Sequence, residues 1–246
     1  MLKNLKIYQN KKKLKIVALL TGKGGSQLKN KNLLKINNKK ILEYPCFEAK
    51  KIKSINEFYV SSEDDLILKA AKKLDFKEIK RPKKLSQNNS KHIDVLKHSI
   101  KYLNKKNIYP DILVVLLANA PTIKSEWIEK SIKILKKNKR ITAVVPVQKN
   151  NDFHPYRAKK IYKGFLKPFI QLKNKISTNR QDLESNYFLC HNFWTIKTSS
   201  IFENKGNSPW TFMGKNCKPL IIKNSIDIHN ETDLIVAKYI LKNFYK

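Results

Sequence analysis

Short apolar runs alternate with amphipathic segments along the first half of the chain. Strands are predicted at 14–20, which is apolar apart from Lys15, at the β-rich segment 57–62, and at 111–117 and 142–147. The length of the run at 14–20 suits a buried strand better than a helix. Apolar residues spaced three or four positions apart predict helices at 41–54, 63–74, 92–103, around 127–135 and at 231–244. This alternation favours an α/β domain in three layers, with helices on both faces of an open, mostly parallel sheet.

The pattern changes after residue 148. Three segments then predict, in order, a small hairpin that turns at Lys163-Gly164, a further strand and a return to the main sheet: 159–172, 186–196 and 219–223. We therefore expect residues 150–185 to be an insertion that lies over the site or makes a dimer contact. Residues 1–13 are predicted to be a polar N-terminal extension, and 14–246 a single domain.

Composition narrows the possible partners. The length of 246 residues and the 41% apolar content allow one large core and exclude wholesale disorder. No apolar run reaches the roughly 18 residues that a membrane span needs, so no membrane contact is expected. The formal charge of +33 could attract nucleic acid, because lysines neutralise backbone phosphates. The lysines are spread along the whole chain, however, which favours a solvated lysine-rich surface, or a general attraction of anionic substrates, over a nucleic-acid partner.

The three cysteines, Cys46, Cys190 and Cys217, are scattered and odd in number. They predict neither a disulfide framework nor a zinc site, since both need paired or clustered cysteines. The basic N-terminus precedes only a strand-length apolar run and no small-residue cleavage pattern, which argues against a signal peptide. We therefore expect a cytoplasmic protein with reduced thiols.

A glycine-containing loop follows the first apolar run, at Thr21-Gly22-Lys23-Gly24-Gly25-Ser26. Glycines allow backbone N–H groups to approach a phosphate closely, and Lys23, Lys29 and Lys31 supply the opposite charge. The spacing is that of neither the P-loop nor the dinucleotide fingerprint. The loop therefore predicts a polyphosphate ligand at the carboxyl end of the first strand.

Several further segments combine with this loop into an ordered set. They are Lys31-Asn32, Tyr59-Val60-Ser61-Ser62-Glu63-Asp64, Arg81-Pro82-Lys83-Lys84-Leu85, His154-Pro155, Asn179-Arg180-Gln181-Asp182-Leu183 and Ser225-Ile226-Asp227-Ile228-His229. Together with the loop, these segments resemble the motifs of the acylneuraminate cytidylyltransferase family, which makes CMP-activated acidic sugars. The resemblance extends over nearly the whole chain, and it is carried by the order and spacing of the motifs.

The resemblance implies a Rossmann-like nucleotidyltransferase fold, usually in a homodimer whose hairpin insertion reaches the neighbouring subunit. It also implies that CMP is transferred from CTP to an acidic 2-keto sugar, a nonulosonate such as sialic, legionaminic or pseudaminic acid, with release of pyrophosphate. Charge develops on phosphate oxygens in such a reaction, so catalysis would depend on positioning and on cations. The expected cofactor is Mg²⁺.

The nucleotide side of the expected site rests on the glycine loop. Lys31 matches the phosphate-binding lysine of the family, and Lys23 stands where the family has an arginine, so both are predicted to be catalytic. Gly24, Gly25, Ser26 and Asn32 are predicted to bind the nucleotide, with Asn32 reading the cytosine. Each also has an ordinary structural explanation: surface charge for the lysines, a turn or a cap for Asn32 and Ser26.

The sugar and metal sides depart further from the family. Arg180 and Gln181 are predicted to bind the sugar carboxylate, and Asn119 takes the place of a glutamine that is Ala118 here; a structural ion pair of Arg180 is the alternative. Asp227 is the predicted Mg²⁺ ligand. His229 replaces the usual second aspartate, and it either orients a bound water, contributes nothing or marks a degraded metal site.

Two other functions remain open at this point. One is a nucleotidyltransferase of the same fold that uses another sugar, a polyol phosphate or another nucleotide. The other is a basic nucleic-acid-binding protein without catalysis, although the chain lacks an RNA-binding aromatic signature and a helix-turn-helix pattern.

Overall fold

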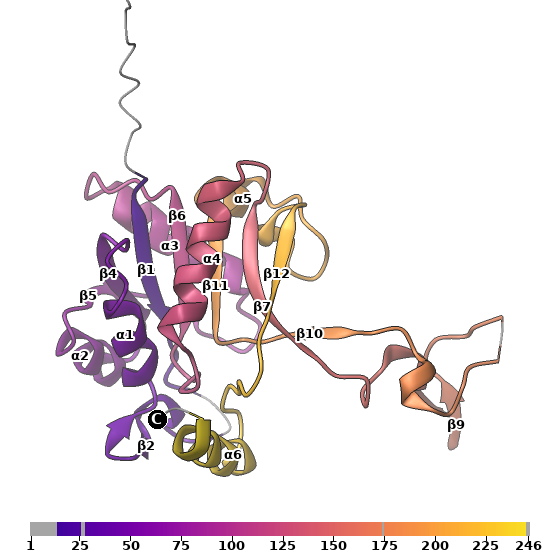
Figure 1. The fold of residues 1–246 in the computed structure, drawn as a ribbon. Helices are drawn as coiled ribbons and strands as arrows, with labels where there is room; N and C mark the ends of the chain where they lie inside the picture. The colour runs from indigo at the N-terminus through magenta and orange to yellow at the C-terminus, as the bar shows by residue number, and fades with distance from the viewer. Residues whose placement is uncertain (1–13, 26–27, 174, 245–246) are drawn as a thin grey trace, which may run out of the picture.

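The computed structural model describes residues 14–25, 28–173 and 175–244 (Figure 1). The expected extension 1–13 and Ser26 lie outside the described residues. The central sheet contains β1 (Ile16–Thr21), β4 (Glu57–Ser62), β5 (Lys77–Lys80), β6 (Ile112–Leu117), β7 (Ala143–Lys149), β10 (Tyr187–Leu189), β11 (Phe193–Lys197) and β12 (Cys217–Ile221). The helices are α1 (Glu43–Lys50), α2 (Asp65–Lys72), α3 (His92–Asn104), α4 (Ser125–Lys137), α5 (Thr198–Glu203) and α6 (Glu231–Phe244).

The strand order is β10-β7-β11-β6-β1-β4-β5, with β12 pairing β7. The pairs β1–β4, β1–β6, β4–β5 and β12–β7 are parallel, whereas β11 pairs antiparallel with β6 and β7, and β10 antiparallel with β7. The expected α/β fold with a largely parallel sheet is confirmed. The antiparallel strands, β10 and β11, lie on one side of the sheet. From β1 the chain continues to β4 on one side, and β6 lies on the other, so the strand order reverses at β1.

Alternation along the buried strands separates two apolar layers. Ile16, Ala18 and Leu20 of β1 pack with α1, α2 and α4, while Val17 and Leu19 pack with α3 and α5 on the opposite face. All five of these side chains are fully buried, as expected for a strand covered on both faces. The three-layer prediction is therefore confirmed.

A third, smaller apolar cluster lies beside the main core. The hairpin of β2 (Lys35–Ile36) and β3 (Lys39–Lys40) supplies Ile36, and α6 supplies Ala237 and Leu241. Figure 1 shows α6 next to β2, below the sheet. This contact joins the segment after the glycine loop to the C-terminal helix. The loop at 226–229 comes just before that helix in the chain.

Residues 150–185, which we call the arm, extend away from the sheet (right of Figure 1). The arm carries the hairpin of β8 (Lys159–Tyr162) and β9 (Phe165–Pro168), which turns at Lys163 and Gly164 as predicted, both with positive φ. All eight strand residues are exposed. The hairpin therefore contributes no residue to the apolar clusters of the sheet.

Some elements differ from the sequence predictions. The predicted strand 186–196 is two strands, β10 and β11, because a turn at His191-Asn192 interrupts it. Both strands pair antiparallel with β7, and β11 also pairs with β6. The predicted helix 41–54 is shorter, at Glu43–Lys50. β5 and α5 were not predicted: β5 has a single buried residue, Ile79, and α5 is one short turn of helix before an αL residue at Asn204. Among the described residues, no helix is both long and apolar enough to cross a membrane.

Candidate active site

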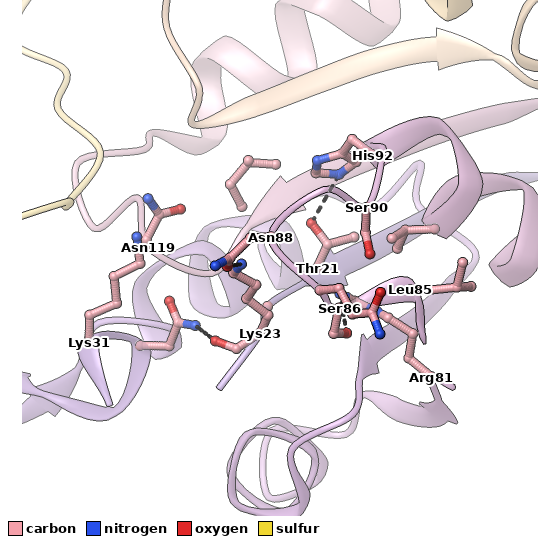
Figure 2. A pocket seen from close by; sticks show the side chains of 15 residues that line it. Thr21, Lys23, Lys31, Arg81, Leu85, Ser86, Asn88, Ser90, His92 and Asn119 are labelled. Atoms are coloured by element: carbon pink, nitrogen blue, oxygen red, sulfur yellow. Dashed lines mark hydrogen bonds between the residues drawn. The ribbon is translucent and has the colours of Figure 1, made fainter. Parts of the chain in front are cut away.

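A cavity of about 250 Å³ opens at the carboxyl ends of β1 and β6, where the strand order reverses. Ligands of open α/β sheets bind at such a reversal, because the loops that leave the two strands diverge there. Figure 2 shows Lys31 and Asn119 on one side, Lys23 and Asn88 in the middle, and Arg81 on the other side. The sequence prediction of a ligand site after the first strand thus coincides with a cavity.

Lys31 comes from a short 3-10 helix, η1 (Lys31–Leu33), directly after the glycine loop. Its Nζ donates to the carbonyl of Ile228 over 2.9 Å. Burial lowers the pKa of Lys31, and so does the charge of Lys23, whereas Asp227 and Asp233 oppose that shift. The ammonium is therefore a partly desolvated cation at the cavity wall, which strengthens its attraction for phosphate.

Lys23 reaches across the cavity to the opposite wall, where its Nζ donates to Asn88 Oδ1 over 3.3 Å. Asn32 is buried below this lysine, and its Nδ2 donates to the Lys23 carbonyl over 3.0 Å. Among the described residues, Asn32 Oδ1 has no hydrogen-bond partner. Four predicted residues, Lys23, Lys31, Asn32 and Asn119, are thus brought together around one cavity.

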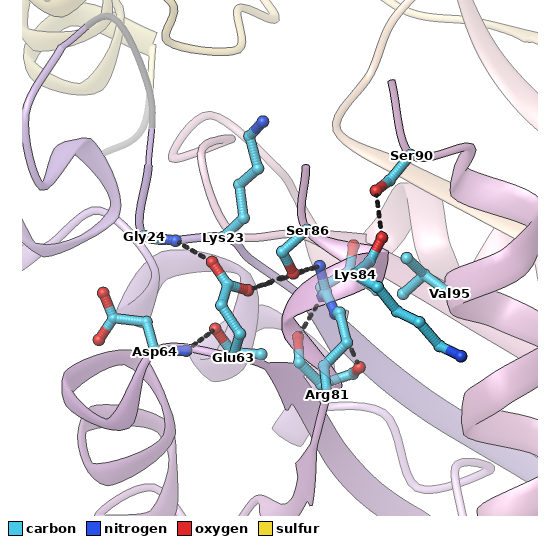
Figure 3. Close-up of polar contacts among 12 residues, drawn as sticks. Lys23, Gly24, Glu63, Asp64, Arg81, Lys84, Ser86, Ser90 and Val95 are labelled. Carbon is cyan, nitrogen blue, oxygen red and sulfur yellow. Dashed lines mark hydrogen bonds and ion pairs between the residues drawn. The ribbon is translucent and has the colours of Figure 1, made fainter. Parts of the chain in front are cut away.

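The other predicted loop residues face elsewhere. The Gly24 amide donates to Glu63 Oε1 over 2.8 Å and does not line the cavity (Figure 3). A Cβ on Gly24 would lie 2.3 Å from Asp64 Oδ2, so this position requires glycine for packing. Gly25 is exposed and has open space around it, while Gly22, which was not predicted as a site residue, lines the cavity.

Asn119 follows β6 and holds the loop that precedes α6. Its Nδ2 donates to the Ile228 carbonyl over 3.1 Å, and the Ile228 amide donates to the Asn119 carbonyl over 2.8 Å. The Ile228 carbonyl thus accepts from both Asn119 and Lys31. This arrangement fixes Asp227 and His229, the neighbours of Ile228, beside the cavity.

A half-buried histidine forms the inner wall of the cavity. His92 Nε2 lies 3.4 Å from Thr21 Oγ1, whose hydroxyl donates to the Leu116 carbonyl over 3.3 Å. Burial, with Arg81 and His191 nearby, lowers the pKa of His92 to about 3, so its ring is neutral at physiological pH. Since the Thr21 proton is directed at Leu116, the ring donates from Nε2 in this arrangement.

Asp227 and His229 contact each other at the edge of the site. The His229 Nε2 lies 3.3 Å from Asp227 Oδ2, and the Asp233 carboxylate accepts from the backbone amides of His229 and Asn230. Among the described residues, no group of three His, Cys, Asp or Glu side chains could hold a metal by itself. One carboxylate, Asp227, suits Mg²⁺, which typically binds one or two carboxylates and takes its other ligands from phosphate and water.

Arg180 and Gln181 lie on the arm and not in the cavity. Arg180 pairs with Asp152 of the same arm, and both side chains are more than half exposed. Within one chain, the predicted sugar-binding pair is therefore separate from the predicted nucleotide-binding residues. The ion-pair alternative for Arg180 is observed, although it leaves much of the guanidinium accessible.

Sequence reasoning missed several residues of this site. Arg81, Asn88 and His92 line the cavity, and Glu63 lies behind it. Arg81 and Glu63 belong to two of the motif segments that carry the family resemblance, so the sequence did offer a signal for these two residues. Asn88 and His92 were not predicted as site residues, and their place in the wall depends on how the loop after β5 folds back over β1.

Comparisons with known proteins identify the family and the fold of the chain. A family model described as cytidylyltransferase matches residues 23–184. A curated relative, post-translational flagellin modification protein B of Campylobacter coli, is 24% identical over 236 residues, covering 92% of this chain and 95% of the relative.

Solved structures share the fold. CMP:2-keto-3-deoxy-manno-octonic acid synthetase complexed with CTP aligns with a TM-score of 0.67 and 14% identity over 93% of this chain and 98% of the other. A 4-diphosphocytidyl-2C-methyl-D-erythritol synthase from Anaerococcus prevotii aligns with a TM-score of 0.64 and 16% identity over 94% and 99%.

The fold and the family model together define a nucleotidyltransferase. Because the family model covers well over half of its length, the chain belongs to the cytidylyltransferase family, which includes the acylneuraminate cytidylyltransferases.

Proposed function

We propose that this enzyme transfers CMP from CTP to an acidic 2-keto sugar of the nonulosonate type. The observation that carries the proposal is the convergence of Lys23 and Lys31 on one open cavity at the carboxyl ends of β1 and β6. Two cations on an open cavity suit a triphosphate with its base. The sequence resemblance and the solved neighbour that contains CTP support the choice of nucleotide and acceptor.

In the proposed reaction, the anomeric hydroxyl oxygen of the sugar attacks the α-phosphorus of CTP. The new P–O bond forms as the bond to the α,β-bridging oxygen breaks, pyrophosphate leaves and the hydroxyl proton passes to solvent. Negative charge increases on the bridging oxygen and on pyrophosphate. Lys31 and Lys23 stabilise that charge from fixed positions, which lowers the barrier without reorganisation.

Base selection is assigned to Asn32. Its Oδ1 is an acceptor without a partner among the described residues, while its amide is fixed by the Lys23 carbonyl. The exocyclic amino group of cytosine is a donor, whereas uracil presents a carbonyl at that position. Such an acceptor favours CTP over UTP, since a carbonyl opposite it would leave both oxygens unpaired.

Asp227 is the proposed Mg²⁺ ligand, together with oxygens of the nucleotide phosphates. A bound Mg²⁺ would neutralise charge on those phosphates and orient the α-phosphate. His229 contacts the same carboxylate and would be the residue to orient a water bound to the ion. The charge of Asp227 opposes the lowering of the Lys31 pKa by burial, and so favours the protonated lysine that phosphate binding needs.

A second hollow of about 220 Å³ borders Asp227 and is the proposed acceptor site. Gln148, Asn150, Cys190 and Ser225 line it with polar groups, and Phe188 supplies an apolar wall. An acceptor placed there would have its hydroxyl on the Asp227 side, facing the nucleotide. The arm leaves the sheet from this region, after β7.

We also propose that two chains form a dimer through their arms, so that Arg180 and Gln181 of one chain reach the acceptor site of the other. Large apolar residues of the hairpin, Ile161, Phe165 and Leu166, are each more than two-thirds exposed. Apolar surface of this kind typically marks an interface. Arg180 would pair with the sugar carboxylate in exchange for Asp152.

Pyrophosphate release tests the proposal directly. Purified protein is incubated with CTP, UTP, ATP or GTP, with and without Mg²⁺, and with a panel of acidic 2-keto sugars and a polyol phosphate. Release that needs CTP, Mg²⁺ and a 2-keto sugar is expected. Release with the polyol phosphate and with none of the sugars would show that the acceptor belongs to a different class. A protein that does not bind CTP would overturn the proposal.

A further inference from the structure

The peptide group between Lys23 and Gly24, in the glycine loop, is fixed by two hydrogen bonds, one to its carbonyl and one from its amide. The carbonyl of Lys23 accepts from Asn32 Nδ2 over 3.0 Å, and the amide of Gly24, in the same peptide group, donates to Glu63 Oε1 over 2.8 Å. Figure 3 shows the Glu63 side chain between Gly24 and Ser86. Since a peptide group is planar, these two bonds fix its orientation and the direction in which Lys23 leaves the backbone.

Glu63 connects this peptide to the opposite wall of the cavity. Its second oxygen, Oε2, accepts from Ser86 Oγ over 2.5 Å, and Arg81 Nη1 lies 3.9 Å from the same oxygen. Arg81 is buried and also donates to Ser86 Oγ and to the Ser61 carbonyl. One carboxylate thus links the loop after β1 to the loop after β5, and these loops form the two sides of the cavity.

Glu63 remains ionised in this position. Burial alone would raise its pKa, but the hydrogen bonds from Ser86 and the Gly24 amide and the charge of Arg81 outweigh burial, and the pKa is lowered. The carboxylate does not line the cavity, so it has no direct contact with a ligand there. Its effect on a ligand must pass through the residues that it holds.

We propose that Glu63 is a positioning residue for the nucleotide: it fixes the Lys23–Gly24 peptide against the Ser86 wall and thereby directs the Lys23 ammonium into the cavity. The inference rests on the proposed function, because it takes CTP as the ligand. It predicts that Glu63 contributes to CTP binding only when Lys23 is present. It further predicts that hydrogen bonding to Gly24, and not the charge of Glu63, is what CTP binding requires.

The test measures the Kd of CTP by calorimetry, in the presence of Mg²⁺, for Glu63→Ala, Lys23→Ala and the double variant. We expect Glu63→Ala to raise Kd about tenfold in the wild-type background but less than about twofold in the Lys23→Ala background. Equal effects of Glu63→Ala in both backgrounds would overturn the inference. A wild-type protein that binds no CTP would overturn the proposed function, and the inference with it.

Glu63→Gln separates positioning from general stability. Glutamine keeps an acceptor for the Gly24 amide but removes the charge opposite buried Arg81, so Tm should fall while Kd stays within about threefold of wild type. A Kd that worsens in parallel with Tm would indicate a merely structural role and reject the proposal. The matched control is Glu57→Ala, at the other end of β4, which removes ion pairs to Lys15 and Lys77 and should leave Kd unchanged.

Discussion

The Nζ of Lys31 lies 2.9 Å from the carbonyl oxygen of Ile228, although 197 positions separate the two residues. The same carbonyl accepts from Asn119, so three distant segments meet at one oxygen atom. This contact places the predicted phosphate lysine beside Asp227, the predicted metal ligand. The two halves of the proposed catalytic apparatus are therefore joined by a backbone group.

Replacing Lys31 tests the phosphate assignment. Lys31→Ala should lower kcat/KM for CTP by more than about tenfold, because it removes a partly desolvated cation at the cavity wall. Far-UV circular dichroism and Tm should show that the fold is kept. The matched control is Lys35→Ala, four residues away and exposed on β2, which should retain activity. Wild-type kinetics in folded Lys31→Ala would refute the assignment.

Activity should decline on the alkaline side earlier than for an ordinary lysine. Burial lowers the pKa of Lys31, so the ammonium loses its proton, and its attraction for phosphate, at a lower pH than free lysine does. The kcat/KM profile for CTP should therefore fall as pH rises through this lowered pKa. Lys31→Arg should move that limb to higher pH, since arginine stays protonated. If kcat/KM falls at the same alkaline pH in Lys31→Arg as in the wild type, the titrating group is not Lys31.

The metal prediction concerns Asp227. Asp227→Asn should raise the Mg²⁺ concentration needed for half-maximal activity by at least about tenfold, because a neutral amide binds this hard cation poorly. Glu231→Gln, four residues away on the exposed start of α6, is the control. An unaltered Mg²⁺ requirement in Asp227→Asn would remove Asp227 from the metal site.

Two neighbouring glycines should respond differently to alanine. Gly24→Ala places a methyl group against Asp64, whose carboxylate caps α2 through the Leu66 and Ile67 amides, and should destabilise the fold by about 1–2 kcal/mol. Gly25→Ala meets open space and should change the free energy of unfolding by less than about 1 kcal/mol. Urea unfolding measures both. Equal destabilisation would show that the loop packs differently.

The proposed dimer depends on the exposed hairpin of the arm. Phe165→Ser combined with Leu166→Ser should convert the protein to a monomer in sedimentation experiments and reduce sugar-dependent turnover, while CTP still binds. Ile235→Ser, an equally exposed apolar position on α6, is the control and should leave the assembly intact. If the hairpin variant sediments like the wild type, the arm is not the dimer contact.

Much of the fold is encoded locally. The apolar run at β1 and the amphipathic spacing of α3 and α4 identify elements whose burial follows from their own side chains. The same is true of the glycine loop, because glycines and lysines after a buried strand indicate a phosphate site at its end. β5 escaped prediction since only Ile79 is buried, so its strand character comes from pairing with β4.

The sequence by itself therefore determined the three-layer class, the loop after β1, the family resemblance and four of the residues that line the cavity, Lys23, Lys31, Asn32 and Asn119. The tertiary structure alone decided three things: that the Gly24 amide turns to Glu63 and not to the cavity, that Arg81, Asn88 and His92 complete the wall, and that Arg180 is held away on the arm. The physical reason is sequence separation. Periodicity reports which side chains are buried, whereas a hydrogen bond between loops far apart in the chain depends on how the sheet brings their ends together.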